Sequence, residues 1–246
     1  MISTPFALPL DFIGPPLEKG RLPTFIYFSI SAHESLHLEP YCQPAQMLSH
    51  EGIRVFSMTL PAHGPGFDKI TAISQWGEAM RKGIDLIAPF LEKAEKTIHW
   101  LSEQNIVSSL AIGGLSRGAF FATHLAARIK AIKTLVGFAP LVKLSTARGF
   151  EKVEKSTLYD LENLTGKLTH LDHVRFYIGN RDTLVDTDAV YHFIRALAES
   201  AYEKRVRSCQ SELTISHAIG REGHGTSTAI FRQGADFIKH CLQEEI

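Results

Sequence analysis

The stretch LAIGGLSRGAFFATHLAAR, residues 110–128, decides the fold. It begins with an apolar run typical of a buried strand and ends with apolar residues at helical spacing. Between these two parts lies Gly114-Leu115-Ser116-Arg117-Gly118, which matches the pattern G-x-S-x-G. A serine at a tight turn from strand to helix is typical of a nucleophile elbow. The stretch therefore predicts that Ser116 stands above a sheet, at the N-terminus of a helix.

The two glycines of the pentapeptide have a steric reason. The serine of such an elbow has a strained backbone, and side chains at Gly114 and Gly118 would collide across the turn. The pattern also fits a glycine-rich turn in which Ser116 merely caps a helix. A Walker loop is excluded because no Gly-Lys-Ser/Thr follows, and a dinucleotide fingerprint fails at Leu115.

A serine nucleophile needs a base and a carboxylate that orients the base. Both belong at the carboxyl ends of later strands, in the chain order serine, acid, histidine. Asp182 follows the apolar run VRFYI, and His224 follows SELTI within GREGHG. We therefore expect Asp182 and His224 to be catalytic. The alternatives are that Asp182, like Asp186, starts a helix, and that His217, nearer the strand, is the base.

Strand-length apolar runs alternate with helical patterns along the chain. This alternation predicts an α/β fold with a mainly parallel sheet flanked by helices. The expected strands cover residues 23–30, 53–58, 108–113, 134–138, 174–178 and 211–215. The expected helices cover residues 43–50, 117–129, 187–202 and 226–241.

Two further segments lie between these elements. Apolar residues spaced by three or four from Trp76 to Leu101 predict one long helix, kinked at Pro89 because proline removes a backbone donor. Residues 141–170 carry several charges and no strong period. We expect this segment to be a short excursion over one end of the sheet.

With these elements in place, the chain resembles the α/β-hydrolase superfamily, in particular its dienelactone-hydrolase-like and prolyl-oligopeptidase-like serine hydrolases. The resembling stretches are GGLSRGAFFATHLAAR with the later VGFAP, then FYIGNRDTLVDT, then GREGHGTS, and the match extends from about Pro23 to Cys241. The resemblance implies a single α/β-hydrolase domain over residues 1–246. It also implies a Ser116–His224–Asp182 triad and an acyl-enzyme formed without a cofactor.

The resemblance also implies an oxyanion hole, in which backbone amides stabilise the charged intermediate. One amide should belong to Arg117, and the other to the loop after the strand that ends near Ile30. Many relatives carry His-Gly in that loop, whereas this chain has Ser29-Ile30-Ser31-Ala32. Because backbone donors do not depend on side chains, we expect Ser31 or Ala32 to supply the second donor.

Other residues are expected near the substrate or in turns. We expect His33 and Glu34, in the loop at the pocket mouth, and Leu115, beside the nucleophile, to contact substrate. The sequence Leu60-Pro61-Ala62-His63-Gly64 resembles the Pro-Gly-His-Gly turn of the family. We expect His63 to be a structural turn residue.

The sequence HESLH, residues 33–37, also matches the zinc-protease pattern H-E-x-x-H. On a helix, His33 and His37 would share a face and bind zinc, with Glu34 as the base. The context argues against this interpretation, because Pro40 disturbs a continuing helix and no third ligand follows at helical spacing. We therefore expect no metal site and no cofactor.

Composition narrows the class of protein. The chain has 246 residues, 44% hydrophobic, with 26 basic and 26 acidic side chains, which suits a sizeable core and argues against a nucleic-acid partner. The three cysteines form no even framework, and the N-terminus has no basic segment typical of a signal peptide. No run reaches the roughly 18 apolar residues that span a membrane. We expect a cytoplasmic protein.

The sequence leaves three functional hypotheses. The first is a serine esterase that cleaves a small-molecule ester. The second is a zinc peptidase that uses HESLH. The third, motivated by the altered loop at residues 29–34, is an inactive hydrolase fold that binds a ligand or partner. The sequence leaves open the physiological substrate, the oligomeric state, and whether the cleaved bond is an ester, a thioester or a peptide bond.

Overall fold

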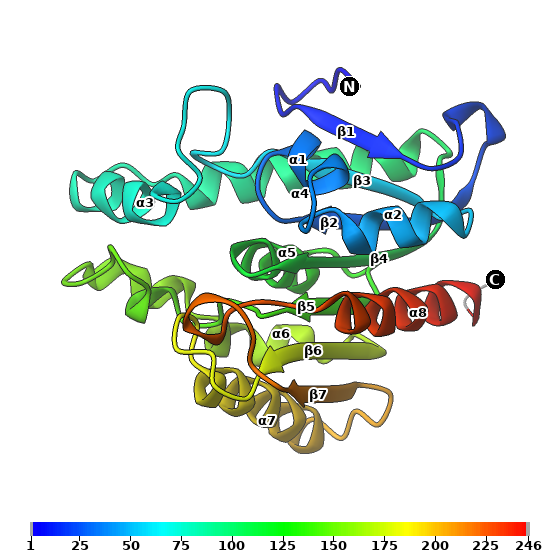
Figure 1. The fold of residues 1–246 in the computed structure, drawn as a ribbon. Helices are drawn as coiled ribbons and strands as arrows, with labels where there is room; N and C mark the ends of the chain where they lie inside the picture. The colour runs from blue at the N-terminus through cyan, green and yellow to red at the C-terminus, as the bar shows by residue number, and fades with distance from the viewer. Residues whose placement is uncertain (1, 245–246) are drawn as a thin grey trace.

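The computed structural model describes residues 2–244, which form one seven-stranded sheet in the order β1-β3-β2-β4-β5-β6-β7 (Figure 1). Only β1 is antiparallel, and the other neighbouring strands pair in parallel. The mainly parallel sheet and the expected strands are confirmed; the short edge strand β1 was not expected. The strands are β1 (Leu10–Ile13), β2 (Leu22–Phe28), β3 (Arg54–Met58), β4 (Val107–Leu115), β5 (Thr134–Phe138), β6 (His173–Gly179) and β7 (Gln210–Ser216).

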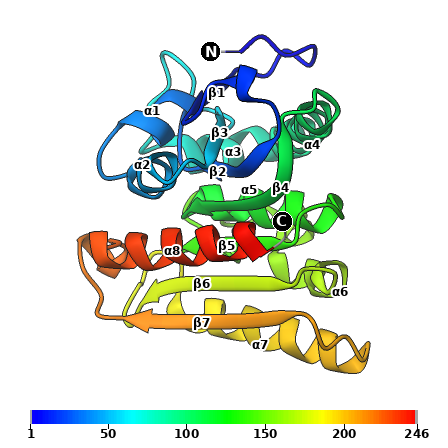
Figure 2. The same ribbon diagram turned by 90° about the vertical axis from the view of Figure 1, so that its right-hand side faces the viewer.

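Helices cover both faces of the sheet. In Figure 2, α8 passes in front of β5, whereas α7 lies behind β7. The helices are α1 (Ala32–His37), α2 (Gln43–His50), α3 (Ala72–Arg81), α4 (Ile87–Glu103), α5 (Arg117–Arg128), α6 (Thr165–Leu168), α7 (Thr187–Glu203) and α8 (Thr228–Glu244). Among the residues that the structure describes, no helix combines the length and apolarity needed to cross a membrane.

The apolar strands face two cores. In β2, Ile26 and Phe28 belong to the core that also contains residues of α4, α5 and α7, whereas Phe25 and Tyr27 belong to the core that contains residues of α2 and α8. Successive side chains of a strand point to opposite faces, so a strand covered on both sides must be apolar throughout. This requirement explains why the strands are visible in the sequence as continuous apolar runs.

The helix expected from Trp76 to Leu101 is two helices, and this prediction was wrong. α3 ends at Arg81, and Gly83 then adopts a left-handed conformation with a φ of 78°. Ile84, assigned to the apolar face of one helix, is 55% exposed in the connecting turn. Pro89 lies in the first turn of α4, where its missing N–H leaves no helical bond unmade, so it causes no kink.

The segment at residues 141–170 forms the expected excursion. It contains the 3₁₀ helices η2 (Leu144–Thr146), η3 (Glu154–Tyr159) and η4 (Leu161–Leu164) and then the short helix α6. The Asp160 carboxylate joins its two parts by accepting hydrogen bonds from the Ser145 amide and hydroxyl. His124 of α5 donates from Nε2 to the carbonyl of Tyr159, which fixes the excursion to the main body.

Candidate active site

Ser116 lies at the turn between β4 and α5, as the sequence predicts. Its φ of 55° and ψ of −117° are strained for a residue with a side chain, and its amide donates to the carbonyl of Phe138 at 2.8 Å. A Cβ at Gly114 would lie 2.3 Å from the Gly118 carbonyl carbon, and a Cβ at Gly118 would lie 1.9 Å from the oxygen of Phe28. The elbow therefore requires both glycines.

The structure brings Ser116, His224 and Asp182 together from three loops. Parallel register aligns the carboxyl ends of β4, β6 and β7 at one edge of the sheet. The Nε2 atom of His224 is 2.9 Å from Ser116 Oγ, and its Nδ1 atom is 2.7 Å from Asp182 Oδ2. An ionised carboxylate only accepts, so Nδ1–H donates to Asp182, and Nε2 is left to accept the serine proton.

Asp182 is held rigidly as an acceptor. Its side chain is fully buried, and Oδ1 accepts hydrogen bonds from the amides of Leu184 and Val185 at 3.0 and 3.1 Å. These bonds leave Oδ2 for the imidazole. Asp186, which the sequence also offered as a helix-starting residue, caps α7 by accepting from the amide of Asp188.

The loop that presents His224 packs against the loop that carries Asp182. The amide of Thr183 donates to the carbonyl of Glu222 at 2.9 Å. Gly223 has a φ of 75°, and a Cβ there would lie 2.1 Å from the oxygen of Arg181. The glycine thus permits the close approach that brings the imidazole to its carboxylate, whereas His217, the alternative base, is exposed.

Two of the backbone amides that the sequence suggests for an oxyanion hole are not engaged in hydrogen bonds among residues 2–244. The amides of Arg117 and Ser31 have no hydrogen-bond partner within residues 2–244. The amide of Ala32 instead donates to Thr59 Oγ1 at 3.0 Å. The preceding amides of Ser29 and Ile30 both donate to Ser35 Oγ. The loop therefore leaves Ser31, rather than Ala32, as the second candidate donor.

The Arg117 side chain forms a buried network that the sequence did not indicate. Its Nη1 donates to the carbonyl of Lys69 at 2.7 Å and to His63 Nε2 at 3.1 Å. His63 Nδ1 donates in turn to the carbonyl of Pro61. Burial lowers the pKa of His63 to about 4, and the Arg117 charge adds to this effect, so His63 is neutral at pH 7. These bonds give His63 a structural role in its turn.

Glu34 and His33, expected to contact substrate, have other partners. The Glu34 carboxylate accepts from Ser31 Oγ at 2.7 Å and from Lys69 Nζ at 3.1 Å. Partial burial raises the pKa of Glu34, but these hydrogen bonds outweigh it and hold the pKa below its usual value. His33 is exposed and lies beside Asp11. The third candidate, Leu115, is the last residue of β4 and packs partly into the core.

A cavity adjoins the acid loop. It has a volume of about 530 Å³ and is lined by residues from the segments 141–147 and 180–188, among them Asp182. The excursion supplies one wall, and the loop between β6 and α7 supplies the other. Of the three hydrogen-bonded residues, Asp182 lines this cavity, whereas Ser116 and His224 do not.

No family model matches the sequence, and no curated protein matches it. Solved structures do match over nearly the whole chain. TT1662 from Thermus thermophilus has a TM-score of 0.72 at 16% identity, with 97% of this chain and 95% of that chain covered. A cold-adapted esterase from an Arctic intertidal metagenomic library has a TM-score of 0.66 at 17% identity, with 95% and 88% covered.

A third similar structure is Est1E from Butyrivibrio proteoclasticus with bound ferulic acid. Its TM-score is 0.65 at 14% identity, and the match covers 97% of this chain and 95% of that chain. Likeness at this identity establishes architecture rather than activity. Together with the parallel sheet and the serine turn between β4 and α5, it shows that the chain has the α/β-hydrolase fold.

Proposed function

We propose that this protein is a serine hydrolase that cleaves small carboxylic esters. The observation that supports this best is the continuous hydrogen-bonded path from Ser116 Oγ through His224 to the buried Asp182 carboxylate, with distances of 2.9 and 2.7 Å. A hydroxyl, an imidazole and a carboxylate in this order form the apparatus of acyl transfer. The fold agrees with this proposal, because the solved structures that resemble it include a cold-adapted esterase.

The mechanism follows from the role of each atom. His224 Nε2 takes the Ser116 proton as Oγ attacks the ester carbonyl, and the amides of Arg117 and Ser31 stabilise the oxyanion. The protonated imidazole then gives its proton to the leaving alcohol, which produces an acyl-Ser116. His224 next takes a proton from water as the water attacks the acyl carbon. The imidazolium then gives this proton to Ser116 Oγ as the bond between Oγ and the acyl carbon breaks and the carboxylic acid leaves. Asp182 keeps Nδ1 protonated throughout and stabilises the imidazolium.

A small ester is favoured by the size of the excursion and of the cavity that Asp182 helps to line. The excursion at residues 141–170 consists of short helical turns, which is little material for an elaborate lid. The cavity of about 530 Å³ beside Asp182 suits a small acyl or alcohol group. We also propose that the chain is one domain in a reducing cytoplasm, where its cysteines, which form no disulfide within the described residues, would stay reduced.

Hydrolysis of p-nitrophenyl acetate, butyrate and octanoate by the wild type and by Ser116→Ala tests the proposal. We expect the variant to lose about 10⁴-fold or more of kcat. Ser102→Ala, a change in an exposed serine of α4, serves as the control and should retain activity. Mass spectrometry after treatment with a fluorophosphonate should find the label on Ser116 alone.

The competing hypotheses predict different results. Activity that survives Ser116→Ala but is lost with a chelator would favour a metal hydrolase. If the wild type neither turns over the esters nor takes the fluorophosphonate, an inactive binding module would replace the proposed hydrolase. Labelling without turnover would keep the serine chemistry and indicate a narrower substrate.

A further inference from the structure

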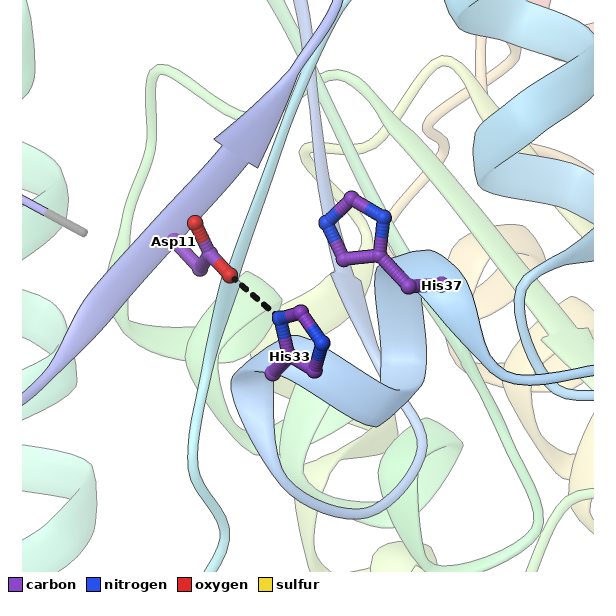
Figure 3. Close-up of side chains that lie close together, drawn as sticks. All are labelled: Asp11, His33 and His37. Carbon is purple, nitrogen blue, oxygen red and sulfur yellow. Dashed lines mark hydrogen bonds and ion pairs between the residues drawn. The ribbon is translucent and has the colours of Figure 1, made fainter.

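A second cluster of ionisable side chains lies where β1 meets α1, outside the Ser116 centre. Figure 3 shows Asp11 of β1 and His33 and His37 of α1 pointing toward one another. One potential ligand atom from each side chain lies within 4.8 Å of the other two. His33 Nδ1 is 3.3 Å from Asp11 Oδ2, and the two imidazole rings have centroids 4.5 Å apart. Chain segments far apart in the sequence thus supply two imidazoles and a carboxylate to one place.

The spacing fits a metal ion. Zn²⁺ binds imidazole nitrogen and carboxylate oxygen at about 2.0–2.2 Å in tetrahedral geometry, which places two ligand atoms about 3.3–3.6 Å apart. The His33–Asp11 distance of 3.3 Å already lies in this range. All three ligand atoms lie within 4.8 Å of one another, so a movement of about 1 Å or less brings each pair into this range. Because the His33 side chain is 74% exposed, its ring can rotate to make that movement.

The backbone orients these side chains before any ion binds. His33 and His37 are four residues apart on α1 and therefore share a face. Ser31 caps α1 by accepting from the amide of Glu34, which fixes the start of the helix. Asp11 is only 13% exposed, and its Oδ1 accepts from the amide of Phe12, so Oδ2 is directed at His33.

The donor set selects the metal and argues against a peptidase. Imidazole nitrogens favour zinc and its neighbours in the transition series, whereas Mg²⁺ and Ca²⁺ prefer sites built from oxygen. Glu34, which would be the base of a zinc peptidase, is bonded to Ser31 and Lys69 instead. We propose that Asp11, His33 and His37 bind one Zn²⁺ ion, which ties the edge strand β1 to α1 and leaves a coordination position open to water.

Zinc titration of chelator-treated, dialysed protein against a coloured competing chelator tests the assignment. We expect one Zn²⁺ per chain in the wild type and no displacement by millimolar Mg²⁺. His37→Ala and Asp11→Asn should each weaken binding about tenfold or more, because a ligand is removed. His192→Ala, at an exposed histidine of α7, is the matched control and should bind as the wild type does.

Two more variants test whether zinc binding belongs to this cluster alone. Ser116→Ala and Glu34→Gln should each retain one tightly bound Zn²⁺, because neither residue is a proposed ligand. Melting temperature provides a second readout: zinc at about 100 times the wild-type Kd should raise the wild-type value by about 5–10 °C, and the same zinc concentration should raise that of His37→Ala by about half as much or less. The assignment is overturned if the wild type binds no zinc, in which case the cluster is only an ion pair. It is also overturned if His37→Ala and Asp11→Asn bind like the wild type.

Discussion

Two histidine–aspartate pairs in this molecule use the same atoms in different surroundings. His224 Nδ1 lies 2.7 Å from Asp182 Oδ2, and the two side chains are 17% and 0% exposed. His33 Nδ1 lies 3.3 Å from Asp11 Oδ2, and those side chains are 74% and 13% exposed. The sequence predicts the first pair, because Asp182 and His224 each follow an expected strand, but it gives no sign of the second.

The difference lies in what surrounds each carboxylate. Asp182 accepts amide hydrogen bonds from Leu184 and Val185 and is fully withdrawn from water, so its attraction for the imidazole is weakly screened. In the other pair Asp11 is mostly buried, but the His33 ring is 74% exposed, so solvent screens their attraction. Ion pairs that solvent reaches contribute about 0–1 kcal/mol to stability. A buried pair is therefore suited to hold a tautomer, whereas an exposed pair can exchange its proton for a metal ion.

Removing the carboxylate from each pair gives the largest expected contrast. Asp182→Asn should lower kcat/KM for p-nitrophenyl butyrate about 10⁴-fold, because the amide no longer enforces the reactive tautomer of His224. Asp11→Asn should change that rate by less than about threefold, since an exposed pair does little for the rest of the fold. Equal losses in the two variants would show that the pairs are not separate in function.

The backbone beneath the buried pair offers a second contrast. Gly118→Ala should cost about 3 kcal/mol or more of unfolding free energy, because the new Cβ would lie 1.9 Å from the oxygen of Phe28, a backbone atom that cannot move aside cheaply. Gly64→Ala is the control. Its Cβ would meet no atom within 4 Å, and the cost should be within about 0.5 kcal/mol. Urea denaturation measures both, and a tolerated Gly118→Ala would mean that the elbow can relax.

These contrasts show which features the sequence could reveal. The strands were visible because strands covered on both faces are apolar at every position. Ser116, Asp182 and His224 were visible because the order of strands brings their following loops to one edge of the sheet. The alternation of strand and helix patterns implies a parallel sheet, and the parallel sheet brings these three loops together.

Other features depend on contacts that leave no local pattern. β1 is four residues long and is defined by its antiparallel pairing with β3, so it is too short for a pattern of apolar residues to predict it. The pairing of β1 with β3 places Asp11 beside His33 and His37. The helical spacing of the HESLH segment therefore contains no third ligand, because that ligand comes from another part of the chain. The Arg117 network joins a loop carbonyl and a buried histidine across more than forty residues.

A third histidine, His124, is buried like His224 but is bonded to a carbonyl instead of a carboxylate. His124 is 5% exposed and donates to the carbonyl of Tyr159, and burial lowers its pKa to about 4. The unfolded chain, with a histidine pKa of about 6.5, binds the proton more readily than the folded chain between these values. Stability contributed by neutral His124 is therefore present above about pH 6.5 and is lost as the pH falls toward 4.

The corresponding loss between pH 7 and pH 5 is about 2 kcal/mol of unfolding free energy for this one group. Urea midpoints at the two pH values should therefore lie closer together in His124→Gln than in the wild type, whatever the variant does to stability at pH 7. His192→Gln, which changes an exposed histidine, should leave the separation unchanged. If the His124→Gln midpoints stay as far apart as those of the wild type, His124 is protonated in the folded protein. Burial alone would then be insufficient to keep an imidazole neutral in this fold.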